Sequence, residues 1–321
     1  MPAYTAKRQA FPIIVHFGGI SMKLIGTHSG SFHADDALGV AMLLALYPAA
    51  TVVRSRDPEV WATCDALVDV GGEFDPALNR FDHHQKGFSE RRENGIPYAG
   101  SGLVWHAFGE CYVQHVCPWI TAGMARKVAQ EVDARLIQHA DSVDTGISVP
   151  GPAYFQLSGF IDTMNATWQE DGLGDDMRFA DAVSVAGTVL RNVVRAVDAE
   201  HAAAEFVRAA ETRANGRILV LDVARLPFDP VVCNEMPDVL FVVYPESKGQ
   251  QIQVRVVPKV LGSFVARADL PEAWAGLRDD ELARVTGVED AVFCHNGRFI
   301  CGARSQAGAI RMAELALDAL K

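Results

Sequence analysis

The segment LIGTHSGSFHADD (residues 24–36) decides the fold, because a short apolar run leads directly into two histidines and two aspartates. A second segment of this kind is LNRFDHHQ (78–85), and between them lies ALVDVGG (66–72), an apolar run with one carboxylate inside it. An unpaired buried carboxylate is very costly, so charged side chains gathered at the ends of apolar runs indicate bound metal ions. Imidazole and carboxylate together suit Mn, Fe, Co or Zn, and Mg where carboxylates dominate.

Strands and helices alternate along the first part of the chain. We expect, in order, a strand at 24–25, a helix at 35–47, a strand at 50–55, a short helix at 58–63 and a strand at 66–70. This alternation predicts a parallel sheet with crossover helices. Sites in open sheets of this kind form outside the carboxyl ends of the strands, which is where His28, Asp69 and Asp82 fall.

The remainder of the chain predicts further helices and then a second domain. Its expected elements are helices at 101–109 and 119–140, a loop at 165–176, a long helix at 179–215 that Asn215-Gly216 closes, strands at 217–222, 239–244 and 251–257, a hairpin of 291–295 with 299–301 around the turn dipeptide Asn296-Gly297, and a closing helix at 305–320. The predicted organisation is an N-terminal extension (1–21), a metal-binding catalytic domain (22–170), a connecting helix (171–214) and a smaller α+β domain (215–321).

Composition limits the class of protein. With 321 residues, 49% of them apolar, the chain can build a real core in one or two domains. A net charge of −11 argues against a broad surface that coats nucleic acid. The six cysteines form no CxxC pair and read as reduced thiols, and no apolar stretch reaches the roughly 18 residues of a membrane span, so we expect a cytoplasmic protein.

The charged side chains at the strand ends suit a two-metal site, in which paired cations activate water and clamp both oxygens of an in-line displacement. Asp69 is the expected bridging carboxylate. The expected ligands are His28 and His33 for one ion, and Asp35, His83 and Asp144 for the other. Asp82 would orient a ligand histidine, and His84 would touch substrate or donate a proton.

Each of these residues also has a plainer interpretation. A single histidine or aspartate at a strand end is more often a cap or a turn residue than a ligand. For Asp36 we prefer that interpretation, since a carboxylate in the first turn stabilises a helix through its dipole. For Asp141 two interpretations stay open: it supports the site, or it faces solvent. For the six expected ligands taken together, the plain interpretation fails.

The second domain carries a candidate phosphate site. Its expected members are His295, Asn296, Arg298 and Arg304, which lie at the hairpin and at the start of the last helix, with Lys259 and Arg267 as weaker candidates. Arginine suits bidentate phosphate contact, and a helix start attracts anions. No run of aromatic residues alternates with Arg or Lys, so a short oligonucleotide fits better than a long polymer.

The ordered motifs HxxxxHxD, strand-Asp, DHH and Asp-Thr resemble the DHH superfamily of metal-dependent phosphoesterases, and within it the Melanocyte Proliferating Gene (MYG) family. The similar segments are GTHSGSFHADDAL (26–38), VDVGGEFDP (68–76), RFDHHQKGF (80–88), SGLVWHAFG (101–109), DSVDTGI (141–147), GSFVARADLPEAWAGLRDDEL (262–282) and CHNGRFICGARSQAGAIRMAELAL (294–317). The resemblance implies a DHH-phosphoesterase-like parallel-sheet domain, a connecting helix, a smaller domain that supplies phosphate-binding residues, and a Mn²⁺- or Mg²⁺-dependent centre between the domains. The superfamily's usual first motif has an aspartate where His33 stands, and the softer ligand favours Mn over Mg.

Together these features predict a metal-dependent phosphodiesterase, a 3′–5′ exonuclease of RNA or short oligonucleotides that uses two divalent ions, Mn²⁺ foremost and Mg²⁺ as the alternative. Two other classes stay open. One is a hydrolase of a small phosphoester or of peptide bonds, and the other is a binding protein that kept the scaffold without turnover. The expected partner is RNA or an oligonucleotide and no membrane, and the oligomeric state is left open, a homodimer included.

Overall fold

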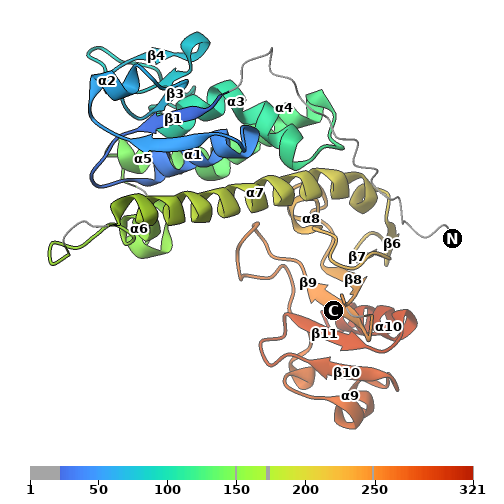
Figure 1. The fold of residues 1–321 in the computed structure, drawn as a ribbon. Coiled ribbons are helices and arrows are strands. Elements are labelled where there is room, and N and C mark those ends of the chain that lie inside the picture. The colour runs from blue at the N-terminus through green and yellow to red at the C-terminus, as the bar shows by residue number, and fades with distance from the viewer. Residues whose placement is uncertain (1–21, 149, 171–173, 248, 321) are drawn as a thin grey trace. The chain divides into compact units, whose positions relative to one another are not determined.

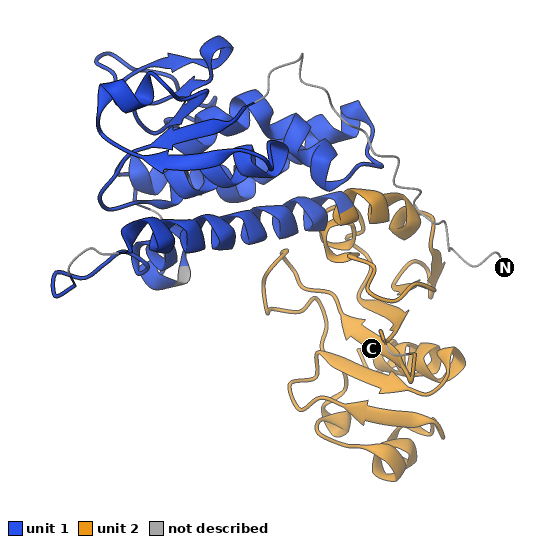
Figure 2. Ribbon diagram, in the orientation of Figure 1, with its two compact units in different colours: residues 1–198 blue, residues 199–321 orange. Residues whose placement is uncertain are grey.

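The computed structural model describes residues 22–148, 150–170, 174–247 and 249–320 (Figure 1). The chain divides into two compact units, with the boundary after Asp198 (Figure 2). Each unit has its own β-sheet and its own hydrophobic core. The mixed α/β architecture expected from the sequence is therefore confirmed.

The first unit contains a five-stranded sheet in the order β2-β1-β3-β5-β4. Its strands are β1 (Leu24–Thr27), β2 (Thr51–Arg54), β3 (Ala66–Val68), β4 (Phe74–Asp75) and β5 (Arg80–Phe81). All neighbouring pairs are parallel except β4 with β5. The carboxyl ends of β1, β2, β3 and β5 therefore lie along one edge of the sheet, where open α/β sheets place their sites.

Helices surround this sheet and supply most of its core. They are α1 (Ala34–Leu46), α2 (Pro58–Trp61), α3 (Gly100–Val116), α4 (Ala122–Val132), α5 (Gln138–Asp144), α6 (Leu157–Asp162) and α7 (Asp175–Arg208). Residues 34–43 of α1 are all buried, so this helix is a central rather than an amphipathic one. The single helix expected over 119–140 is interrupted, because a π-helical turn at Asp133–Ile137 joins α4 to α5.

The long helix α7 is shorter at its end than the sequence pattern suggested. It begins at Asp175 and ends at Arg208, and Glu211–Arg213 form strand β6, which pairs antiparallel with β7 (Ile218–Val220). The expected stop signal Asn215-Gly216 belongs instead to the β6–β7 turn, where both residues have positive φ (55° and 83°). Asn-Gly is a hairpin dipeptide as well as a helix terminator, so the dipeptide alone could not separate the two outcomes.

The second unit is built on a six-stranded sheet in the order β10-β11-β9-β8-β7-β6. Its remaining elements are β8 (Phe241–Pro245), β9 (Ile252–Val256), β10 (Ala291–Cys294), β11 (Ile300–Ala303), α8 (Asp229–Glu235), α9 (Asp279–Thr286) and α10 (Gln306–Asp318). In the β10–β11 hairpin the positive φ falls on Arg298 (55°) and not on Gly297. Among the helices of the described residues, none combines the length and the hydropathy that a membrane crossing requires.

Candidate metal centre

A cluster of histidine and aspartate side chains lies at the carboxyl edge of the first sheet. His28 directly follows β1, Asp69 follows β3, and Asp82 and His83 follow β5. Asp144 joins them from the last residue of α5. The cluster opens into a cavity of about 990 Å³ lined by His28, Ser31, His33, Arg56, Trp61, Asp69, Val70, Gly71, Gly72, Asp82, His83, His84, Asp144, Thr145 and Gly146.

Asp69 is the central carboxylate of this cluster. Its Oδ2 lies 3.4 Å from Nε2 of His28, and its Oδ1 lies 3.2 Å from Nε2 of His83. His84 Nδ1 approaches the same Oδ1 at 3.5 Å. Asp69 also has a left-handed backbone (φ 55°), a conformation that costs energy in a non-glycine residue and that occurs at functional sites.

Asp144 is a second shared carboxylate. Its Oδ2 lies 3.1 Å from Nε2 of His83, and its Oδ1 lies 3.4 Å from Nδ1 of His33. Residues separated by more than a hundred positions in the sequence therefore meet, and the continuous set of contacts runs from His28 through Asp69, His83 and Asp144 to His33.

Two groups within the cluster could each hold a metal ion. They are Asp69 with His83 and His84, and His33 with Asp35 and Asp144, and in each group the ligand atoms lie within 4.8 Å of one another. This grouping differs from the predicted one, which paired His28 with His33. The two imidazole rings are 6.2 Å apart between centroids, and each faces a different carboxylate.

Buried polar atoms without hydrogen bonds show that the residues fit a metal. Oδ1 of Asp35, Oδ1 of Asp69 and Nε2 of His83 are buried and have no hydrogen-bond partner. An unsatisfied buried donor or acceptor costs roughly 1–3 kcal/mol of stability, so three of them in one cluster would destabilise the protein considerably unless they bound a ligand. Imidazole nitrogens and carboxylate oxygens that converge in this way form the donor set of a divalent ion.

The carboxylates of the cluster strongly favour positive charge on the groups beside them, as they would in a site that binds cations. Burial alone would lower the pKa of His28, but Asp36 and Asp69 outweigh it and raise the pKa to about 10. For His83, burial is likewise outweighed by Asp144 and Asp69, and the pKa is about 10. Burial would raise the pKa of Asp69, yet the neighbouring imidazoles of His28 and His83 outweigh it and bring the pKa to about 2.

The pKa of Asp35 is shifted in the opposite direction to that of Asp69. Asp35 is fully buried, and its pKa is raised well above the usual value, first by burial and then by the negative charges of Asp69 and Asp144. Its Oδ2 accepts a hydrogen bond from the backbone N–H of Gly100, the first residue of α3, at 3.1 Å. A Cβ on Gly100 would lie 2.9 Å from Cβ of Asp69, so only glycine lets this helix start approach the carboxylates.

Asp82 supports His84 and not a predicted ligand. Its Oδ1 lies 2.8 Å from Nδ1 of His84 and also accepts the backbone N–H of His84 at 3.0 Å. His84 is 61% exposed at the cavity wall. Its pKa is raised, mainly by the hydrogen bond with Asp82.

The open question about Asp141 is resolved in favour of a supporting role. Asp141 is buried, and its carboxylate accepts hydrogen bonds from Ser101 Oγ (2.6 Å), Gly102 N (3.0 Å) and Arg92 Nη2 (2.8 Å). Burial raises its pKa to about 6, against the opposing effect of Arg92. Because it lies one turn before Asp144 on α5, this network fixes the helix that supplies Asp144.

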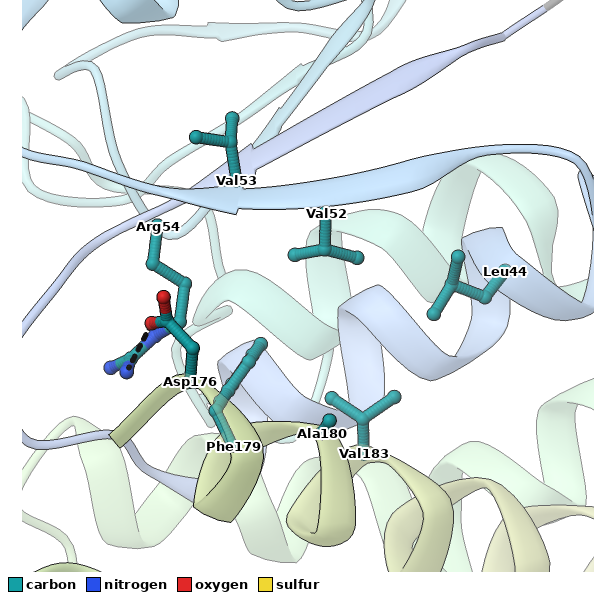
Figure 3. Close-up of a pocket in the computed structure, with 8 residues that line it drawn as sticks. All are labelled: Leu44, Val52, Val53, Arg54, Asp176, Phe179, Ala180 and Val183. Atoms are coloured by element: carbon teal, nitrogen blue, oxygen red, sulfur yellow. Dashed lines mark hydrogen bonds and ion pairs between the residues drawn. The ribbon is translucent and has the colours of Figure 1, made fainter. Parts of the chain in front are cut away.

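The loop between β1 and α1 is held from outside the cluster. Arg54 Nη2 donates to the carbonyl of Gly30, and its guanidinium lies 4.8 Å from the ring centroid of Phe179 on α7. Figure 3 shows this arginine at one end of a cavity of about 300 Å³, paired with Asp176. The side chain of Asn165 adds two 2.9 Å hydrogen bonds to the backbone N–H and carbonyl of Phe32.

Asp36 has two roles where the sequence suggested one. Its Oδ1 accepts the backbone N–H of His33 at 3.0 Å, which is the expected stabilisation of the start of α1. Its Oδ2 lies 3.2 Å from Nε2 of His28, so it also contacts the cluster.

Arg56 and Trp61 line the metal cavity and were not predicted from the sequence. The signal for Arg56 was present, because it lies two residues after the end of β2, at the carboxyl edge of the sheet.

The predicted phosphate residues lie in the second unit and do not form one group. His295, Asn296 and Arg298 share the β10–β11 turn, whereas Arg304 lies at the far end of β11. Arg298 Nη2 lies 3.3 Å from a carboxylate oxygen of Asp269. The weaker candidate Arg267 has a structural role, since its guanidinium donates to the carbonyls of Val232, Cys233, Met236 and Val239 around the end of α8.

The fold and the cluster define an α/β protein with a candidate divalent-metal centre at the carboxyl edge of a parallel sheet. A family profile described as Uncharacterised protein family (UPF0160) matches residues 24–317. The chain is 33% identical over 325 residues to MYG1 exonuclease of Homo sapiens, covering 91% of this chain and 85% of that one. It is 30% identical over 313 residues to the MYG1 protein of Dictyostelium discoideum, covering 90% and 94%. The chain belongs to this MYG1 exonuclease family (UPF0160).

A solved structure also matches along most of the chain. It is an exopolyphosphatase-related protein from Bacteroides fragilis, 12% identical, covering 92% of each chain with a TM-score of 0.22. A superposition with so low a score carries no argument about this protein.

Proposed function

We propose that this protein is a metal-dependent phosphodiesterase that acts as a 3′–5′ exonuclease on RNA or short oligonucleotides. The observation that carries the proposal is the cluster around Asp69, whose buried imidazole and carboxylate atoms converge without hydrogen bonds beside an open cavity. Relatives named MYG1 exonuclease support a hydrolase of the nuclease class.

In this proposal six side chains hold the metal ions. They are His28, His33, Asp35, Asp69, His83 and Asp144. Two divalent ions bound there, Mn²⁺ foremost and Mg²⁺ as the alternative, would neutralise phosphoryl oxygens and lower the pKa of water. Asp69 and Asp144 each face two histidines, so these two carboxylates set the spacing of the ligands.

His84 and Asp82 act on the substrate side of the cluster. His84 is exposed to the cavity, and the Asp82 carboxylate fixes its ring and favours its protonated form. A protonated imidazole at this position can donate a proton to the leaving oxygen of a phosphodiester.

We assign residues 22–170 to a catalytic domain and 215–321 to a domain that binds flanking phosphate, with α7 between them. His295, Asn296, Arg298 and Arg304 are its proposed substrate-binding residues, with the turn residues foremost. All six cysteines are free thiols, which supports a cytoplasmic location.

The test is Asp69→Asn, measured on protein that was stripped with chelator and reloaded with Mn²⁺. A 5′-labelled oligoribonucleotide should be shortened stepwise by the wild type, and the variant should be slower by about 1,000-fold because the central ligand is lost. Asp181→Asn, an exposed carboxylate on α7, is the matched control and should behave as wild type. Pyrophosphate, cyclic dinucleotides and peptides complete the panel, and cleavage of peptides alone would overturn the proposal.

A further inference from the structure

One arginine lies in the wall of the metal cavity, among the histidines and aspartates of the cluster. Arg56 follows β2 and is the one Lys or Arg residue among the described residues that line this cavity. Asp69, Asp82 and Asp144 lie on the same wall. A guanidinium beside a cluster of carboxylates and imidazoles needs a reason, because no step assigned to the metal ligands requires it.

The guanidinium of Arg56 is held in place but is not neutralised. Its Nε donates to the carbonyl of Ser29 at 3.0 Å, and its Nη2 lies 3.4 Å from Nδ1 of His28. No carboxylate forms an ion pair with it within the part of the chain that the structure describes. By contrast, Arg54 and Arg92 nearby both pair with aspartates. Arg56 therefore keeps its charge and further N–H groups for a ligand that enters the cavity.

An aromatic face accompanies this free charge. Trp61, the last residue of α2, lines the same cavity and packs against the small apolar cluster of Cys64, Leu67 and Val70. Its Nε1 donates to the carbonyl of Ser55 at 2.8 Å, so the indole is fixed to the residue that directly precedes Arg56. The indole is thus anchored to the backbone one residue before Arg56, and both side chains line the cavity.

We propose that Arg56 and Trp61 form a nucleoside-phosphate subsite, in which Arg56 binds the reacting phosphate and Trp61 stacks on the base of the nucleotide that carries it. The inference rests on the proposed function and names its recognition residues. Guanidinium suits phosphate oxygens, and indole stacks on any base with little sequence preference. Only one imidazole ring, that of His28, separates Arg56 from the carboxylates of the cluster.

Three small probes separate the two contributions by calorimetry on the Mn²⁺-loaded protein: adenosine 5′-monophosphate, ribose 5-phosphate and adenosine. Arg56→Ala should weaken binding of the two phosphate-containing probes by about tenfold to a hundredfold and leave the affinity for adenosine unchanged. Trp61→Ala should weaken the two adenosine compounds by about tenfold and leave ribose 5-phosphate unchanged. Arg91→Ala, an exposed arginine outside the cavity, should change none of them.

Two further variants guard against a purely structural effect. Arg56→Lys keeps the charge but loses the planar fork, so binding of the phosphates should be intermediate. Trp61→Leu keeps apolar packing without the large aromatic face, and it replaces Trp61→Ala if that variant does not fold. Wild-type affinity of the Arg56 and Trp61 variants for all three probes would overturn the subsite. If the probe pattern appears but no oligonucleotide is cleaved, the subsite stands and the exonuclease proposal fails.

Discussion

Binding of metal to the cluster should release protons, because the histidines proposed as ligands, His28 and His83, are protonated at neutral pH without metal. The pKa values of His28 and His83 are both about 10, three units above neutral pH. A metal ligand must be a neutral imidazole, so each histidine has to lose its proton before an ion can bind. Three pKa units correspond to about 4 kcal/mol for each imidazole at pH 7.

The magnitude follows from these values. Near pH 7 about two protons should leave for each protein molecule filled with metal, one from each histidine. The apparent Kd for Mn²⁺ should fall about tenfold per pH unit for each imidazole proton displaced. Titration calorimetry of chelator-stripped protein at pH 6.5–8, in buffers of different ionisation enthalpy, gives both quantities.

The same histidines set the pH dependence of stability without metal. Their folded-state pKa is raised above the ordinary value of 6.5, so their contribution is complete below that pH and is lost as the pH rises through about 10. Chelator-treated protein should therefore lose Tm steadily from neutral to alkaline pH, and metal should remove that loss.

The variant His83→Asn should reduce the number of protons released on metal binding by about one. Release of fewer than one proton by the wild type, with a Kd that ignores pH, would refute the reasoning.

Three further variants probe structural supports, two of them beneath the cluster and one in the second unit. Gly100→Ala places a Cβ 2.9 Å from a carboxylate side chain of the cluster and should weaken Mn²⁺ binding about tenfold by calorimetry, whereas Gly123→Ala, with open space around its Cβ, should not; equal affinities would contradict this. Arg92→Ala leaves Asp141 buried without its cation and should lower the urea-derived free energy of unfolding by about 3–5 kcal/mol; a loss below ~1 kcal/mol would count against it. Arg267→Ala removes the donor to four carbonyls and should cost about 2–3 kcal/mol; an unchanged urea midpoint would argue against that role.

The sequence predicted β1, β2 and β3 of the first sheet well because they carry strong local patterns, whereas the short antiparallel strand β4 was not predicted. The apolar run before His28 forms β1, and the helix expected at 35–47 is α1 within one residue at each end. Strand β6 escaped prediction for a physical reason. Its residues Glu-Thr-Arg are all exposed, so it has no apolar alternation, and it exists only because β7 offers a backbone to pair with.

The sequence predicted which residues lie at the candidate site better than it predicted which of them contact one another. Placement at strand ends is a property of topology, and it selected His28, Asp69 and Asp82 correctly as residues of one edge. Which nitrogen faces which oxygen depends on loop paths that spacing does not encode. His28 and His33, five residues apart, therefore turned to different carboxylates. Arg56 carried a positional signal, since it lies two residues after β2, but its neighbours in the cavity wall could not be read from spacing.

The Arg92–Asp141 network shows why buried charge persists beneath this centre. A buried ion pair is weak evidence for stability, because desolvation offsets much of its attraction. The raised pKa of Asp141, about 6, shows that burial outweighs even the contact with Arg92. Positioning explains the network better than stability does. Asp141 ties α5 to the start of α3, α5 supplies Asp144, and the first N–H of α3 holds Asp35. A metal site requires side chains held within about half an ångström, so a rigid ionic anchor one turn from Asp144, a proposed ligand, is justified even where an apolar one would be more stable.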